Sequence, residues 1–150
     1  GFYGGTAAAR IPEPFATAAR NGIDGLTTLQ LDPIWQASHD GHSQVTGVLV
    51  GRSDCLDERP DDISVFLEDC EASVQLAIDT PAETAVLIEQ YGIVKAAIAK
   101  EALPHSGLTF ITGEDMKVIL ADYLGVLYRA NPASVGNALP DHSFYASAGK

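Results

Sequence analysis

The chain has 150 residues, the size of one domain, and its 46% hydrophobic and 19% charged residues are typical of a globular protein rather than a disordered or fibrous one. Its 20 acidic residues outnumber 9 scattered basic residues and give a net charge of −11, which excludes a polyanion-binding surface, so we expect no nucleic-acid partner. The sequence has no run of eighteen apolar residues that would predict a membrane span.

The segment ARIPEPFATAAR, residues 9–20, places a single carboxylate between two prolines in an otherwise small and apolar stretch. Pro12 and Pro14 each fix their own φ and push the preceding residue away from helical geometry. We therefore expect Glu13 in a short extended segment, followed by a helix that begins at Pro14. The residues alone leave two interpretations of Glu13 open, a solvated loop acid or an acid held for binding.

Two short apolar runs predict strands. GLTTLQL (25–31) is rich in β-branched and apolar residues, and VTGVLVG (45–51) is a continuous apolar run typical of a strand buried on both faces. Between them, Asp32 as N-cap and the proline that follows it predict a brief helix over 33–38.

The remainder of the chain predicts helices, because apolar residues recur at three- and four-residue steps and proline, threonine and acidic residues mark the helix starts. The expected helices cover residues 58–79, 80–92, 93–104 and 112–132. Thr80 and Thr112 are the predicted N-caps of two of them. Strands combined with helices predict the α/β class, although two strands are too few for a complete sheet.

The residues with reactive side chains form no catalytic arrangement, so we predict no catalytic residue, no cofactor and no enzymatic activity. His39, Asp40 and His42 share one turn, but two imidazoles in a loop need further ligands in fixed geometry, and we predict a solvated turn with no metal site. Cys55 and Cys70 leave two alternatives open, free thiols, with Cys70 on the apolar face of its helix, or a disulfide.

Read in order, four segments resemble the NMT1/THI5-like substrate-binding proteins of ABC transporters, the nitrate, sulfonate and taurine type. The segments are IPEPFATAA (11–19), LTTLQLDPIWQ (26–36), VTGVLVGRSDCLDERPDDISVFLEDCEASVQLA (45–77) and ITGEDMKVILADYLGVLYRANPASVGNALPDHSFY (111–145). The resemblance covers about residues 8–146, and its strength lies in the order of the segments, because no single one is diagnostic.

The resemblance implies a type II periplasmic-binding-protein fold, in which two α/β lobes hold a ligand in the cleft between them. Only the C-terminal half of that architecture resembles this chain, which begins with Gly1 rather than methionine, so we expect further residues to precede it. By the same resemblance, residues 1–42 are the end of the second lobe with a crossover. Residues 43–150 are then the C-terminal part of the first lobe, a strand followed by helices.

The resemblance also implies site residues. Glu13 would border the cleft and accept a hydrogen bond from an amine or hydroxyl of the ligand, or would pair with a cation in the cleft. A stiff backbone at this place lowers the entropy lost on binding. The ligand-binding residues implied are Glu13, Pro14, Phe15 and Trp35, and the implied hinge residues are Thr46 and Gly47.

The function that the resemblance implies is that of a solute-binding component, or a fragment of one, of an ABC importer. It would bind a small polar or anionic organic solute by lobe closure and present it to the transporter permease. The full-length protein is then expected to be periplasmic or extracellular and anchored to the membrane.

Two alternatives come from other classes of protein. One is a pyrimidine synthase of the THI5 type on the same fold, which carries a cysteine-rich motif that this sequence lacks. The other is a standalone interaction module that binds no ligand and forms a homodimer by strand exchange, because a sheet with open edges is prone to pair with another chain.

Overall fold

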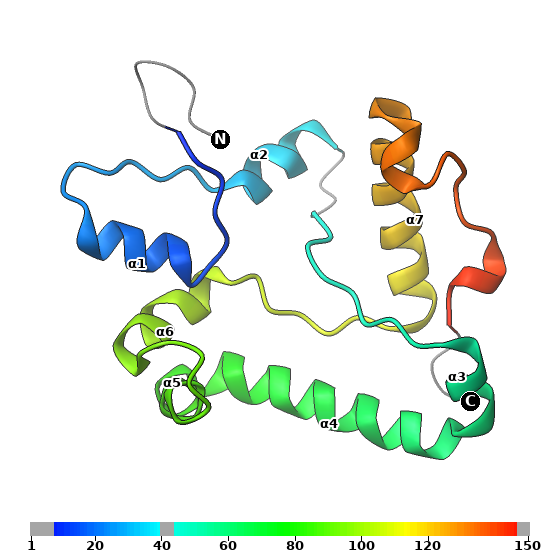
Figure 1. Cartoon of the computed structure of the whole chain (residues 1–150), viewed down its shortest axis with the longest axis horizontal. Coiled ribbons are helices and arrows are strands. Elements are labelled where there is room, and N and C mark those ends of the chain that lie inside the picture. The colour runs from blue at the N-terminus through cyan, green and yellow to red at the C-terminus, as the bar shows by residue number, and fades with distance from the viewer. Residues whose placement is uncertain (1–7, 40–43, 147–150) are drawn as a thin grey trace. The chain divides into compact units, whose positions relative to one another are not determined.

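The computed structural model of the chain describes residues 8–39 and 44–146, and throughout these ranges the regular structure is helical (Figure 1). The α-helices are α1 (Phe15–Gly22), α2 (Leu31–Ser38), α3 (Ser53–Glu58), α4 (Pro60–Asp79), α5 (Pro81–Gln90), α6 (Ala96–Ala102) and α7 (Gly113–Ala130). Short 3-10 helices follow as η1 (Leu103–His105), η2 (Pro132–Val135) and η3 (His142–Phe144).

The α/β class, and with it the partial type II periplasmic-binding-protein fold, is wrong for this chain, because the described residues contain no strand and no sheet. Residues 26–30 are irregular, and the helix α2 takes over at Leu31. Residues 45–51 are also without regular structure, with Val50 85% exposed. A β-branched run becomes a strand only where a neighbouring strand shares its backbone hydrogen bonds, and no described segment does so here.

The helices predicted from apolar spacing and proline signals are confirmed. Pro60 and Pro81 stand at the first positions of α4 and α5, where a missing backbone donor costs nothing. The helix α3 was missed, since six residues are too short a segment to show an apolar period.

The predicted N-cap positions are confirmed, since Thr80 and Thr112 are the N-cap residues of α5 and α7. Neither threonine side chain, however, makes a capping hydrogen bond to its helix. The Oγ1 of Thr80 instead donates to the Leu76 carbonyl oxygen at 2.9 Å, because α4 ends directly before it. Asp32 lies inside α2 rather than before it, and its carboxylate accepts hydrogen bonds from the Gln36 side chain at 2.7 Å and from the Gln44 backbone N–H at 2.9 Å.

The chain divides into two compact units. The described part of the first unit comprises residues 8–29 and 69–109, and that of the second comprises residues 30–39, 44–68 and 110–146. In the first unit α6 packs against both α5 and α1. Its buried side chains are all small, namely Thr17, Ala77, Ala85, Ala99 and Ala102. Small residues of this kind allow helices to approach one another closely.

The second unit is organised around α7. The 3-10 helix η2 packs on α7, and the Asn131 side chain accepts a hydrogen bond from the Ala133 backbone N–H at 3.2 Å at the turn between them. Trp35 on α2 stacks on His39 with ring centroids 3.9 Å apart, and its ring lies 5.4 Å from that of Tyr123 on α7. Aromatic contacts therefore join α2 to α7 within this unit.

Large apolar side chains remain exposed in both units, among them Phe15, Val50 and Tyr91. Folded monomers seldom expose extended apolar surface unless it serves an interaction. Among the residues that the structure describes, no helix combines the length and apolar character needed to cross a membrane.

The carboxylate of Asp141 caps η3, since it accepts hydrogen bonds from the Ser143 hydroxyl at 2.6 Å and from the Ser143 backbone N–H at 2.9 Å. The hydrogen bond from the Ser143 side chain, followed by that from its backbone, holds the pKa of Asp141 below its ordinary value of 3.8. Because the pKa is lower in the folded state, the ionised cap stabilises the turn at every pH above the ordinary pKa of 3.8. This stabilisation is lost as the pH falls through the lowered pKa of the folded state.

We therefore expect the Asp141 carboxyl carbon to titrate below pH 3.8 by NMR, with Ser143→Ala moving the midpoint upward toward that value. Ser134→Ala is the matched control, because its hydroxyl donates to the backbone of Asn131 and not to a carboxylate. An Asp141 midpoint that stays unchanged in Ser143→Ala would contradict this account of the cap.

Candidate functional site

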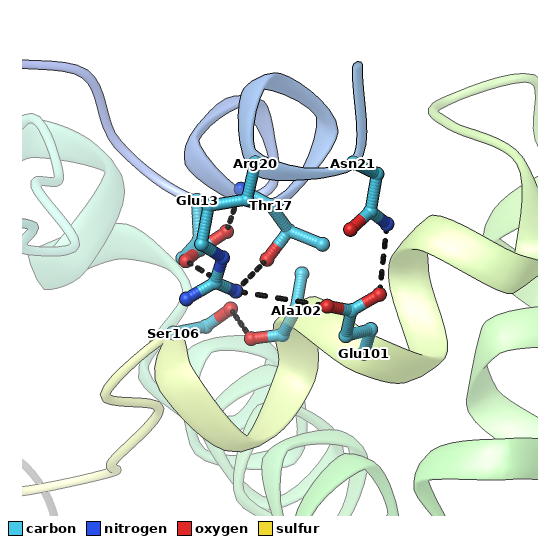
Figure 2. A network of polar contacts seen from close by, with 7 residues as sticks. All are labelled: Glu13, Thr17, Arg20, Asn21, Glu101, Ala102 and Ser106. Atoms are coloured by element: carbon cyan, nitrogen blue, oxygen red, sulfur yellow. Dashed lines mark hydrogen bonds and ion pairs between the residues drawn. The ribbon is translucent and has the colours of Figure 1, made fainter. Parts of the chain in front are cut away.

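The strongest candidate site is a group of polar side chains from α1, from the turn before it and from α6. We call it the Glu13 cluster, and its members are Glu13, Thr17, Arg20, Asn21 and Glu101 (Figure 2). All five residues belong to the first unit. Four come from one short stretch of sequence, and the fifth comes from a helix far along the chain.

Glu13 occupies this position because of how α1 begins. The N-cap of α1 is Pro14, joined to Glu13 by a cis peptide bond, and a proline side chain cannot accept a capping hydrogen bond. The Glu13 carboxylate supplies the missing acceptor, since its Oε2 accepts the Thr17 backbone N–H at 3.0 Å. A carboxylate at a helix N-terminus is also favoured by the helix dipole. Glu13 therefore lies in a turn rather than in the extended segment predicted, and its side chain is only 13% exposed.

Arg20 lies two turns along the same face of α1. Its Nη2 donates to the Thr17 hydroxyl at 2.7 Å and lies 3.9 Å from one carboxylate oxygen each of Glu13 and Glu101. Thr17 is fully buried, so the hydroxyl that accepts from Arg20 is fixed in place. All polar contacts of Arg20 with described residues run through Nη2, and the Arg20 side chain is 27% exposed.

Glu101 connects this face of α1 to α6. Its Oε2 accepts a hydrogen bond from the Asn21 side-chain amide at 2.8 Å, across eighty residues of sequence. One turn further on, the Ser106 hydroxyl donates to the Ala102 carbonyl oxygen at 2.9 Å and holds the end of α6 (Figure 2). The cluster thus joins two helices by polar contacts that are partly open to solvent.

The charges of the Glu13 cluster determine what it can bind. Two carboxylates and one guanidinium give a formal charge of −1. An anion bound to the guanidinium would be repelled by the two nearby carboxylates. An amine or hydroxyl could instead donate to the carboxylate oxygens, and a hydroxyl could also accept from the free arginine donors. The cluster therefore suits a neutral or cationic polar group better than an anionic one.

The implied ligand-binding residues lie in both units. Glu13, Pro14 and Phe15 lie at the start of α1, where Phe15 is 65% exposed. Trp35 lies in the second unit, half-buried on α2 and stacked on His39. Sequence reasoning missed the partners of Glu13, although Thr17 and Arg20 follow it at helical spacing and could have been found. Glu101 gave no local signal.

The implied hinge residues, Thr46 and Gly47, line an open surface depression of about 190 Å³ in the second unit. Val45 and Val48 line it too, together with Leu120, Tyr123 and Leu124 of α7. This depression shares no residue with the Glu13 cluster.

The metal and cysteine predictions concern other parts of the chain. The described residues include no group of three potential metal ligands, and Asp40 and His42 lie outside them. Of the turn, His39 is described, and its Nδ1 lies 3.0 Å from the Trp35 carbonyl oxygen. Cys55 and Cys70 are both free thiols, half-buried, so the disulfide alternative is wrong.

Comparison of the chain with protein-family models, with curated proteins and with solved structures finds no match.

Proposed function

We propose that the chain is a solute-binding component, or part of one, of an ABC importer, and that it binds a small polar organic solute without transforming it. The ordered resemblance of four segments is one support. The observation that carries the proposal is the Glu13 cluster. In it the first of those segments presents a fixed carboxylate, and Arg20, the residue directly after that segment, presents free donors. We propose only that the chain binds a solute, since the α/β fold that the resemblance implies is wrong for it.

Preorganisation is what makes this cluster suitable for binding. Glu13 and Arg20 are held by a backbone N–H and by a buried hydroxyl, so little side-chain entropy remains to be lost when a ligand is bound. The formal charge of −1 leads us to propose a neutral or cationic polar solute in preference to the anionic one that the resemblance also allows. The proposed partner is a transporter permease, and the proposed location is periplasmic or extracellular with a membrane anchor.

A native mass spectrum of the gently purified chain tests this proposal. We expect a species that carries one discrete small-molecule mass, released unchanged on denaturation. Glu101→Gln is expected to lower its occupancy by at least half, whereas Glu83→Gln, an exposed acid on α5 outside the cluster, leaves it unchanged. A bare monomer across all preparations would contradict the proposal, and release of a chemically altered compound would favour the enzyme alternative.

The second candidate function is the dimerising interaction module. Residues 45–50 favour it, because they are apolar, without regular structure and largely exposed. An unpaired apolar segment of this kind is suited to pair with the same segment of a second chain. In the same native mass spectrum, a dimer without any small molecule would support this candidate over the first.

A further inference from the structure

Asn21 is followed by a glycine, and neither of the other two asparagines of the chain is. Asn131 precedes a proline, which has no backbone N–H, and Asn137 precedes an alanine. Asparagine is a chemically labile residue, because the backbone nitrogen of the next residue can attack its side-chain amide carbon. Glycine favours this attack, since it has no Cβ and its backbone turns freely. Asn21 is therefore the asparagine of this chain best placed to lose its amide group.

The structure places Asn21 and Gly22 at an exposed helix end. Both residues are exposed, and Gly22 is the last residue of α1. The backbone N–H of Ile23, directly after the helix, forms no backbone hydrogen bond with a described residue. Helical geometry holds the Gly22 nitrogen away from the Asn21 side chain, so the attack requires this last residue to leave the helix. Helix ends fray and glycine is a poor helix former, so this opening costs little.

The nitrogen of the Asn21 amide also connects α1 to α6. Its Nδ2 donates to Glu101 Oε2 at 2.8 Å, in an exposed hydrogen bond that water can replace (Figure 2). A second polar contact between these helices is the approach of Arg20 Nη2 to the Glu101 carboxylate at 3.9 Å. Loss of the Asn21 amide therefore changes how two helices are joined.

We propose that Asn21 is a site of spontaneous deamidation, in which its side-chain amide becomes a carboxylate. The Gly22 nitrogen forms a bond to Asn21 Cγ and gives up its proton. The bond from Cγ to Nδ2 breaks, and Nδ2 leaves as ammonia with that proton. Water then opens the resulting succinimide ring and leaves either an aspartate or an isoaspartate linkage at this position. The only co-reactant is water.

The product places a new carboxylate opposite that of Glu101. The hydrogen bond is lost, because an ionised carboxylate has no donor, and the two negative charges repel each other. The formal charge of the Glu13 cluster changes from −1 to −2. We expect α6 to hold α1 less firmly after the reaction. This inference does not depend on the proposed importer role, because it concerns the chain without a solute.

Incubation of the full chain at pH 8, followed by tryptic digestion and mass spectrometry, tests the reaction. Cleavage after Arg20 and Arg52 releases a peptide in which Asn21 is the only asparagine. We expect this peptide to gain the mass difference between an amide and a carboxyl group, and fragmentation to locate the gain at Asn21. Asn131 and Asn137 are expected to react more slowly. The reaction at Asn21 is also expected to be slower at pH 6, since the attacking nitrogen must lose its proton.

Gly22→Ala tests the proposed attack, since a Cβ at this position would meet no described atom within 4 Å. The methyl group hinders the approach of the nitrogen and strengthens the end of α1, so the rate is expected to fall roughly tenfold or more. Gly47→Ala is the matched control, because a Cβ there also meets no described atom and the position is remote in sequence from any asparagine. Its rate at Asn21 is expected to equal that of the natural chain.

Asn21→Asp reproduces the aspartate product and tests its consequence. Its Tm is expected to fall by about 2–4 °C, the shift that the loss of one hydrogen bond produces in a chain of this length. Adding Glu101→Gln is expected to restore at least half of this loss, because the new amide donates to the carboxylate at position 21. Asn137→Asp adds the same charge at an exposed side chain without a hydrogen bond to a described residue, and its Tm is expected to stay unchanged.

The inference is overturned if Asn21 keeps its amide while Asn137 loses its own, or if Gly22→Ala reacts as fast as the natural chain. Its consequence for the two helices is overturned if Asn21→Asp and Asn137→Asp have the same Tm. A mass gain at Asn21 that slows in Gly22→Ala but not in Gly47→Ala supports it.

Discussion

Replacing Ala99 with leucine is expected to destabilise the first unit by about 2–3 kcal/mol. The helices α5 and α6 pack against each other (Figure 1), and Ala99 on α6 and Ala85 on α5 are 2% and 1% exposed. A leucine side chain has no space at so close an approach of two helices, so α6 must move away or the side chain must adopt a strained rotamer.

The measurement is urea unfolding followed by far-ultraviolet circular dichroism. Ala97→Leu is the matched control, since Ala97 is an exposed position on the same helix and the substitution changes helix propensity very little. Its free energy of unfolding is expected to stay within about 0.5 kcal/mol of the natural chain. Equal destabilisation by the two variants would show that α5 and α6 do not pack as described.

Replacing Glu13 with alanine is expected to cost about 1–2 kcal/mol, the second largest effect. The substitution leaves the Thr17 backbone N–H without its acceptor at a fully buried residue and removes one carboxylate from Arg20. Glu13→Gln keeps an acceptor oxygen for the N–H and loses only the charge, so about half of this cost is expected.

Hydrogen exchange at the Thr17 amide checks this prediction directly, and its protection is expected to fall in Glu13→Ala. The comparison variant is Glu114→Ala, which removes a carboxylate paired with Lys117 at an exposed helix start. Exposed pairs of this kind contribute little, so a change below about 0.5 kcal/mol is expected. Unchanged protection of Thr17 in Glu13→Ala would mean that Glu13 does not cap α1.

Local sequence signals were sufficient to predict most helices, but they were insufficient to predict which hydrogen bonds the side chains at the helix starts make. Pro60 and Pro81 mark helix starts because a proline at the first position acts through its own φ and its own missing donor, without help from distant residues. Thr80 had the right identity and position for a cap, but the end of α4 offers its hydroxyl a carbonyl oxygen. This acceptor, the Leu76 carbonyl oxygen, belongs to the preceding helix, and the capping pattern around Thr80 does not indicate it.

The candidate site was predictable in part. Glu13 drew attention because two prolines flank it, and the structure gives a reason for the pattern: a proline N-cap needs an acceptor from its neighbour. The helical spacing of Thr17 and Arg20 from Glu13 was available in the sequence and was overlooked. The role of Glu101 was not available, because nothing in its own segment shows that α6 lies against α1.

By itself, the sequence determined where most helices begin and end, and its composition sets the net charge of −11. These properties depend on interactions within a few residues or on composition alone. The tertiary structure decided whether residues 45–51 became a strand and which residues Glu13 contacts. A strand needs hydrogen bonds from another segment, and the Glu13 cluster needs Glu101 from a distant helix, so both depend on which segments meet in space.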